Sequence, residues 1–390
     1  MTIMLTIMLT AISQVTGGNS PGPPPTEGAP VILPRGPLQR TDMVRHRFKM
    51  TVTINYAPVP VTTQDWTLPL IVNGPWSTLD SENFTVVLSE GRDRIVKNGA
   101  EDVSPPGSLG ASELQVPLPE TSSWPLTVQV QANVNSWSSR LDTGAAMQIG
   151  WPDRWPAEVA PLLKPSTLIE SSAEIITGTV EALTKGQVRS VPPVQAAKLI
   201  VQDACTKFRV SETRMSLSQQ GQLRGFAVVG AKAAAKAGVG SPADLVCICV
   251  AMLRAAGLPA RPVIGIGSGT PGRRDEFGVW AEVYLPRCGW TPFDPDKLQQ
   301  QSIGTQDATR SWEYFGTMPG LQRRIPLAWS FAPGSGGTAF DSWALWGWSR
   351  FLQGTDFPIT IQNDAIQTTS GPFSLTPQRP VPSVVRLERQ

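Results

Sequence analysis

The sequence contains a single histidine, His46, among its 390 residues. A cysteine or serine nucleophile at neutral pH needs a neighbouring base to take its proton, and imidazole is the usual one. No histidine lies in the second half of the chain, so no Cys–His or Ser–His arrangement can be built there from local residues. With only four cysteines present, the same scarcity argues against a His/Cys zinc site, and the sequence suggests no metal and no cofactor.

Charge and long apolar runs are also scarce. Charged residues make up 16% of the chain and the net charge is +2, which gives no electrostatic case for nucleic-acid binding. No segment is long enough to span a bilayer. Residues 1–12 have the length of a signal-peptide core, but they lack a basic start and a clear cleavage site. Docking of this segment on a partner is an equal alternative, and the compartment stays open.

The four cysteines, Cys205, Cys247, Cys249 and Cys288, show no disulfide framework. Cys247 and Cys249 lie two apart on an expected helix and are interpreted as small buried apolar residues. Cys288 follows Arg287 in an expected hairpin turn, where an exposed thiol beside a cation can be reactive.

Proline and glycine are abundant, with 37 and 35 copies. They crowd residues 17–40, which should run as an extended, polyproline-like arm within an N-terminal segment 1–44. We expect this arm to tether the protein to other protein subunits. Deleting residues 1–40 should then leave the domain core folded.

Between residues 45 and 150 apolar and polar residues alternate. Phe48, Met50 and Val52 fall on one face of a strand, and a similar run starts at Val128. Period-two runs separated by Pro, Gly and Asn clusters predict antiparallel strands with one solvent-exposed face. Residues 45–150 are therefore predicted to form a β-sandwich-like domain.

Helical spacing begins near Trp155, in a predicted domain 151–350. Ser241 should cap a central helix, with Pro242 at its first position and Asp244 closing a capping box. The buried stripe of this helix should be Leu245, Cys249, Met252, Leu253 and Ala256. Segments 260–266, 279–285 and 290–293 are predicted strands that stack as a sheet on the helix, which makes an α+β core.

Four blocks in this region carry specific motifs. They read G-S-P-A-D from Gly240, L-R-A-A-G-L-P-A-R from Leu253, G-V-W-A-E-V-Y from Gly278 and G-W-T-P-F-D-P from Gly289. Their order and spacing resemble the bacterial transglutaminase-like proteins, relatives of papain-like cysteine proteases, whose blocks read G-x-C-x-D, L-R-A-x-G-I-P-A-R, H-A-W-x-E-V-Y and G-W-x-P-x-D-P. The resemblance implies a transglutaminase-like core with a central helix on an antiparallel sheet.

The same resemblance implies a degenerate triad. The nucleophilic cysteine of the family falls on Pro242 and the base histidine on Gly278, while the third member is kept as Asp294. The sequence therefore predicts a protein that is not a cysteine-type enzyme. We expect Trp280, Phe293 or the loop 267–276 to close over the position that histidine has left.

Three hypotheses for function remain. The first is a catalytically inactive, structural or binding subunit of a larger assembly. The second is a peptide- or glycan-peptide-binding groove, and the third is an enzyme with rebuilt chemistry, for which Asp244 with Asp294, or Glu282 with Asp294, are candidate carboxylate pairs. Trp343, Trp346 and Trp348 form a candidate partner contact before a C-terminal extension, 351–390, that ends in a Pro/Arg-rich tail.

Overall fold

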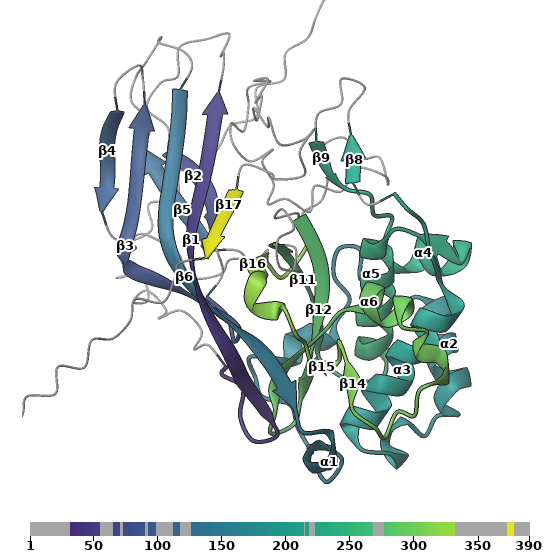
Figure 1. The fold of residues 1–390 in the computed structure, drawn as a ribbon. Coiled ribbons are helices and arrows are strands. Elements are labelled where there is room, and N and C mark those ends of the chain that lie inside the picture. Colours follow the sequence, from purple (N-terminus) through teal and green to yellow (C-terminus); the bar gives the residue numbers. More distant parts are fainter. Residues whose placement is uncertain are drawn as a thin grey trace, which may run out of the picture.

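The computed structural model describes residues 32–54, 65–70, 73–89, 93–98, 112–117, 126–213, 215–217, 223–267, 277–331 and 373–377. The apolar N-terminus, most of the proline-rich arm, the loop 268–276 and the tryptophans at 343, 346 and 348 lie outside these ranges. Within them the chain forms a β-rich part beside a mixed part of helices and strands (Figure 1). None of the described helices combines the length and the apolar character that crossing a membrane requires.

The β-rich part holds a five-stranded antiparallel sheet in the order β17-β1-β6-β3-β4, and β2 pairs with β5 in a separate antiparallel ladder. The predicted antiparallel strands are thus confirmed. The bounds are β1 (Leu38–Ile54), β2 (Asp65–Leu70), β3 (Ser77–Ser89), β4 (Asp93–Asn98), β5 (Ser112–Pro117), β6 (Leu126–Leu141) and β17 (Phe373–Pro377).

The first strand starts earlier than the sequence pattern predicted. β1 begins at Leu38, not after residue 44, and Leu38 is buried opposite Leu141. A β-bulge between Thr41 and Val44, with Asp42 at a φ of 47°, breaks the alternation that would have revealed the strand. A deletion of residues 1–40 would therefore remove the first three residues of β1, including the buried Leu38, so it cuts into the fold and not only into the arm. Strand β17 also ties part of the predicted C-terminal extension to the edge of this sheet.

The mixed part has a four-stranded antiparallel sheet in the order β13-β12-β11-β16. Its strands are β11 (Ala260–Ile266), β12 (Phe277–Leu285), β13 (Gly289–Phe293) and β16 (Ile325–Ala328). The three strands predicted from the motifs are thus present, with β12 and β13 slightly longer than expected. Short pairs join β7 (Arg209–Val210) to β10 (Val239–Gly240), β8 (Met215–Leu217) to β9 (Leu223–Phe226) and β14 (Trp312–Glu313) to β15 (Gly316–Thr317).

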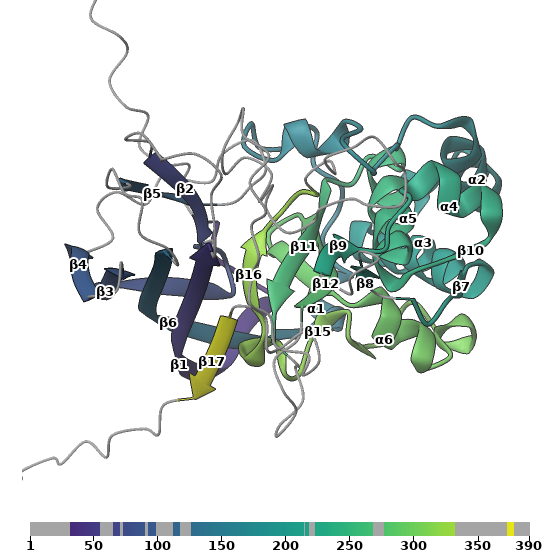
Figure 2. The same cartoon turned by 90° about the horizontal axis from the view of Figure 1, so that it is seen from above.

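Helices cover the face of this sheet that points away from the β-rich part (Figure 2). They are α2 (Glu174–Thr184), α3 (Pro193–Lys207), α4 (Ala231–Ala237), α5 (Pro242–Ala255) and α6 (Pro295–Gln300). The short helix α1 (Thr143–Ala146) lies apart from them and directly follows β6. Single 3-10 turns lie at η1 (Ala160–Leu163), η2 (Val188–Ser190), η3 (Ile303–Thr305) and η4 (Leu321–Arg323). The described part is therefore a mixed α and β fold with antiparallel sheets, as predicted.

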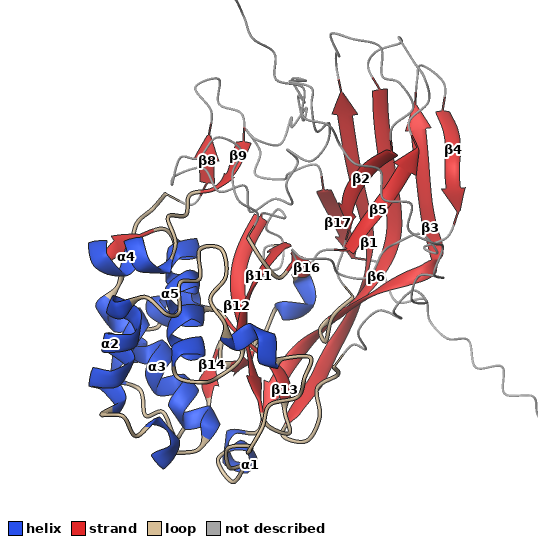
Figure 3. Cartoon of the chain, turned by 180° about the vertical axis from the view of Figure 1, so that it is seen from behind, coloured by secondary structure: helices blue, strands red, loops and turns tan. Residues whose placement is uncertain are grey.

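Helix α5 lies at the centre of the mixed part (Figure 3). It contacts α2, α3, α4 and α6 as well as β11 and β12, and every residue from Pro242 to Arg254 is buried. The predicted stripe of Leu245, Cys249, Met252, Leu253 and Ala256 is buried, but so are the other faces of the helix. A helix that is apolar all round is stable in water only when it is enclosed in this way.

The two parts meet at the side chain and carbonyl of Gln322, in η4. The carbonyl oxygen accepts hydrogen bonds from Ser136 Oγ at 2.6 Å and from His46 Nε2 at 2.7 Å, and Ser138 Oγ donates to Gln322 Oε1. These donors come from β1 and β6, so one glutamine binds both long strands of the β-rich part. Next to it, the N–H of Met318 donates to the carbonyl of Ser139 at 3.0 Å.

The burial of His46 makes this seam sensitive to acid. Its side chain is 2% exposed, and Nδ1 has no hydrogen-bond partner among the described residues. Burial lowers the pKa of His46, with the nearby charge of Arg323 acting in the same direction and the hydrogen bond to Gln322 opposing it. A depressed pKa in the folded state means that the unfolded chain binds the proton more readily, so stability is lost as pH falls below about 6.5.

We expect the free energy of unfolding to fall more between pH 8 and pH 5 in the native protein than in a His46→Gln variant. The glutamine keeps a donor for the Gln322 carbonyl but does not titrate. Urea unfolding at a series of pH values measures both, and the other titrating groups act equally in the two proteins. Parallel pH curves would show that His46 does not carry the effect.

Candidate functional site

The N-terminus of α5 is built as the sequence predicts. Ser241 is the N-cap, and its Oγ accepts a hydrogen bond from the N–H of Asp244 at 3.1 Å. Asp244 Oδ2 accepts in return from the Ser241 N–H at 3.0 Å, which closes the capping box. Pro242 is the first helical residue, a position at which the missing N–H costs nothing. Ser241 Oγ is therefore engaged as a cap and is not poised as a nucleophile.

Asp244 also fastens the segment before α4. Its Oδ1 accepts the N–H groups of Val229 at 2.7 Å and Gly230 at 3.1 Å, and Oδ2 accepts the Ser241 hydroxyl at 3.1 Å. Burial raises the pKa of Asp244, and these hydrogen bonds oppose that rise. With both oxygens bound to donors, the carboxylate holds the helix start in place and has no free lone pair directed at a substrate.

Gly278 lies in β12, opposite Gly265 of β11. A Cβ built on Gly278 would have no heavy atom of the described residues within 4 Å. The Trp280 ring lies over Gly265 instead, so closely that a Cβ on Gly265 would overlap it. Neither Trp280 nor Phe293 lies within 4 Å of that Cβ, because Trp280 packs across to the neighbouring strand and Phe293 packs on Phe315. The loop 268–276 lies outside the described residues, so closure over this position stays a prediction.

Asp294 follows β13 and caps α6. Its Oδ1 accepts from the Lys297 N–H at 3.1 Å, and its Oδ2 pairs with Arg324 Nη1 at 2.7 Å. Phe293 pairs with Ala281, so Asp294 comes beside Trp280, and Gly278 lies on the same face two residues along β12. Arg324 is thus the cationic partner of this buried carboxylate, and its guanidinium lies 5.7 Å from the centre of the Trp280 ring.

The other charged residues of the motif blocks stabilise the scaffold. Arg261 and Glu282, both buried, pair across β11 and β12 with Nε at 2.7 Å from Oε2. Nη2 lies 2.6 Å from the same oxygen, although its N–H groups do not point at it. The guanidinium is held between Trp290, at 4.0 Å, and Trp329, at 3.6 Å from the ring centres. Burial raises the pKa of Glu282, and the charge of Arg261 opposes the rise.

Arg254 of the same blocks is a further scaffold residue. Its Nε donates to the carbonyl of Ala260 at 2.8 Å, and Nη1 donates to the carbonyl of Lys164 at 2.8 Å and to Ser166 Oγ at 2.9 Å. Burial lowers the pKa of Arg254 to about 10, so it is charged at neutral pH. Sequence reasoning missed the roles of Arg254, Arg261 and Glu282. One signal was available: an arginine in one motif block and a glutamate in the next could have indicated an ion pair between two neighbouring strands.

All four cysteines are buried, and none forms a disulfide bond. Burial raises the pKa of Cys288 to about 12, so its thiol is protonated at neutral pH and is not the exposed, reactive thiol that the sequence left as a possibility. Burial also raises the pKa of Cys247 and Cys249. Over the residues that the structure describes, no cluster of three His, Cys, Asp or Glu side chains could hold a metal ion.

The three carboxylates of the candidate pairs each have hydrogen-bond or ion-pair partners of their own. Asp244 binds backbone N–H groups and Ser241, Asp294 binds Arg324 and Lys297, and Glu282 binds Arg261. Each carboxylate is therefore satisfied separately by its own donors. Acid–base chemistry of the two-carboxylate type needs groups that share a reacting centre, and these three side chains serve three different parts of the fold.

Comparison with known proteins identifies the domain. The family model described as the transglutaminase-like superfamily matches residues 181–295. Among solved structures, a candidate cysteine protease from Cytophaga hutchinsonii is 13% identical with a TM-score of 0.46, covering 75% of this chain and 83% of its own. The periplasmic domain of TgpA from Pseudomonas aeruginosa is 13% identical with a TM-score of 0.30, covering 67% and 91%. No curated protein matches the sequence.

The Arg261–Glu282 pair gives a test of the scaffold role. Arg261→Met should lower the free energy of unfolding by about 3–5 kcal/mol, because it leaves a buried carboxylate without its cation. Adding Glu282→Leu to the same protein should recover part of that loss, since both charges are then gone. Urea unfolding of the single and double variants measures the coupling.

The exposed pair Arg310–Asp307, with Arg310 Nε at 4.0 Å from Asp307 Oδ2, is the matched control. Arg310→Met should cost less than about 1 kcal/mol, as expected for a solvated ion pair. If the costs of the two buried substitutions simply add, Arg261 and Glu282 do not depend on each other.

Proposed function

Residues 181–295 are a transglutaminase-like domain, and we propose that this chain uses it without catalysis, as a structural or binding subunit of a larger protein assembly. Three features support the proposal. Pro242 stands where the family motif places its nucleophile, Gly278 provides no base, and the cysteines of the described region are buried. A fold of this kind hosts many functions, so the side chains at the site must decide between them.

The observation that carries the proposal is the environment of Asp294. In a triad, the third residue accepts a hydrogen bond from the histidine and orients it. Here one oxygen of Asp294 is committed to the Arg324 guanidinium and the other to the start of α6. The carboxylate thus stabilises a cation and a helix, and both roles are structural.

A second function is favoured by the open position at Gly278. A glycine with free space in front of it leaves room for a ligand group where a side chain would otherwise stand. Arg324 and the Trp280 ring lie on the same face, and together they offer a cation and an apolar surface. Binding of a peptide or a glycan-peptide without turnover is therefore the second candidate.

We expect the purified full-length protein to show no amidase, protease or acyl-transfer turnover, and thiol reagents to leave that result unchanged. The physical reason is the lack of a nucleophile and of a base at the two motif positions. The measurement is a panel of peptide-amide and glutamine-donor substrates assayed with the native protein and with Asp294→Asn and Cys288→Ala variants. Turnover that disappears in either variant would falsify the proposal and favour rebuilt chemistry.

Native mass measurement of the complex purified from the natural source is the complementary experiment. The proposal expects the chain in fixed stoichiometry with other protein subunits. A chain that purifies alone, but binds peptides or glycan-peptides in titration calorimetry, would favour the groove function instead. A Gly278→Phe variant separates the two, because it should block ligand entry at this position and leave subunit assembly unchanged.

A further inference from the structure

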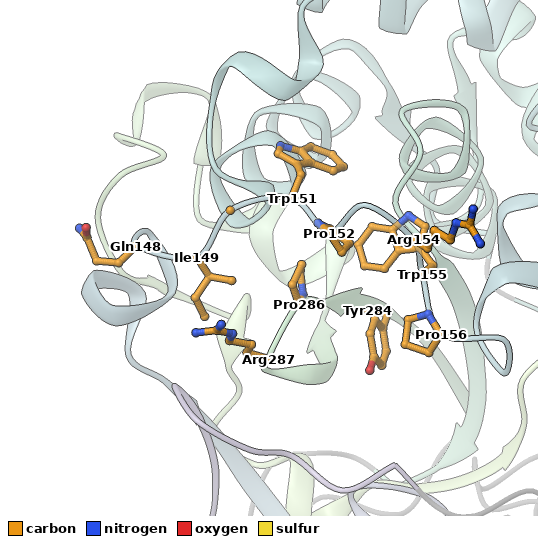
Figure 4. A pocket seen from close by; sticks show the side chains of 11 residues that line it. Gln148, Ile149, Trp151, Pro152, Arg154, Trp155, Pro156, Tyr284, Pro286 and Arg287 are labelled. Atoms are coloured by element: carbon orange, nitrogen blue, oxygen red, sulfur yellow. The ribbon is translucent and has the colours of Figure 1, made fainter.

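A second concave site lies away from the triad positions. It is a cavity of about 500 Å³ between residues 148–156 and the turn that joins β12 to β13 (Figure 4). Two tryptophans, one tyrosine and three prolines make up most of its wall: Trp151, Trp155, Tyr284, Pro152, Pro156 and Pro286. The wall includes the repeated dipeptide Trp-Pro of the segment W-P-D-R-W-P.

The aromatic rings of this wall pack against one another in a row. Trp151 meets Trp155 edge to face at 6.5 Å, and Trp155 meets Tyr284 in the same way at 6.0 Å. Trp151 Nε1 donates to the Val191 carbonyl at 2.8 Å, and Trp155 Nε1 donates to the Gly257 carbonyl at 3.0 Å. Because their N–H groups are occupied inside the fold, both rings are held in place and present apolar surface to an occupant.

Rigid aromatic grooves of this kind suit proline-rich segments. Such segments are already extended in the polyproline II helix, so they lose little entropy on binding, and their rings pack between aromatic side chains. The charge of the residues that line the cavity places a second requirement on any occupant. Arg154 and Arg287 line it and are exposed, whereas no carboxylate is among the described residues of its lining. The fitting occupant is therefore proline-rich and carries a negative charge.

The chain's own arm reaches the wall of this cavity. Ile32 packs on the cluster that contains Tyr284, Trp290 and Trp155. The N–H of Arg35 donates to the Cys288 carbonyl at 3.2 Å, which anchors the arm along the β12–β13 turn. A Cβ on Gly36 would lie 2.8 Å from the Arg287 carbonyl oxygen, and the φ of Gly36 is 59°, so this close approach needs glycine.

We propose that the cavity binds residues 23–31 of this same chain, P-P-P-T-E-G-A-P-V. Among residues 1–31 the one charged side chain is Glu27, five residues before Ile32. Five residues of polyproline II span about 16 Å, enough to carry Glu27 from the Tyr284 wall across the cavity to the arginines. Attachment through Ile32 gives the segment an effective concentration of the order of millimolar, so a modest groove is occupied.

Cross-linking in the full-length protein tests this proposal. Ala29→Cys combined with Gln148→Cys places one thiol on the segment and one at the exposed rim of the cavity, and the buried native cysteines do not compete. Ala29→Cys combined with Lys236→Cys, on exposed α4, is the matched control. A short bismaleimide should join the first pair within one molecule about tenfold faster than the second.

A charge exchange tests the contact of Glu27. Arg154→Glu with Arg287→Glu should slow the first cross-link about fivefold, and adding Glu27→Lys should restore it, whereas Lys185→Glu on the exposed end of α2 should have no effect. A soluble peptide of residues 21–31 should compete with the intramolecular reaction.

Three outcomes would overturn the proposal. A product of dimer mass would show that the occupant comes from a second copy. Equal rates for the two cysteine pairs would show that the segment has no preferred place on the surface. Failure of Glu27→Lys to restore the reaction would show that the segment does not pair with these arginines.

Discussion

A helix that is apolar on every side must be enclosed, and in this molecule α5 is that helix. Its enclosure determines the arrangement of the mixed part, because four helices and three strands contact it. The enclosure also means that the first N–H groups of the helix, which have no partners within the helix itself, need hydrogen-bond acceptors from elsewhere in the protein. Ser241 and Asp244 satisfy part of that need, and Asp244 joins the helix start to the segment that leads into α4. Pro242, the first residue of the helix, thereby lies within a structural cap.

Several residues of the motif blocks serve the scaffold. Arg254 closes the helix–strand connection, Arg261 and Glu282 neutralise each other between two tryptophans, and Trp280 covers Gly265. None of these interactions needs a nucleophile or a base. A chain can therefore keep the recognisable blocks for reasons of stability alone, and the blocks by themselves do not establish an activity.

The sequence was a good guide where structure is decided locally. The cap of α5, the bounds of β11 and the antiparallel strands follow from residue types within a few positions, and they are found as predicted. The sequence was a poor guide where contacts between segments distant in the chain determine the structure. Arg324 lies thirty residues after Asp294, and the hydrogen bonds of His46 and Ser136 to Gln322 join segments that only the fold brings together. The bulge at the start of β1 hid that strand, because an inserted residue reverses the alternation on which prediction depends.

The pairing of Arg324 with Asp294 has a consequence for how such a chain could change. A histidine placed at position 278 would approach a carboxylate that is already neutralised, and the neighbouring guanidinium would disfavour a positively charged imidazole. Removing Arg324 first would leave Asp294 buried without its counter-ion, at a cost in stability. Each of these two substitutions is thus unfavourable by itself, and only their combination avoids the penalty. The ion pair between Asp294 and Arg324 therefore opposes the assembly of a histidine–carboxylate pair at this place by single substitutions.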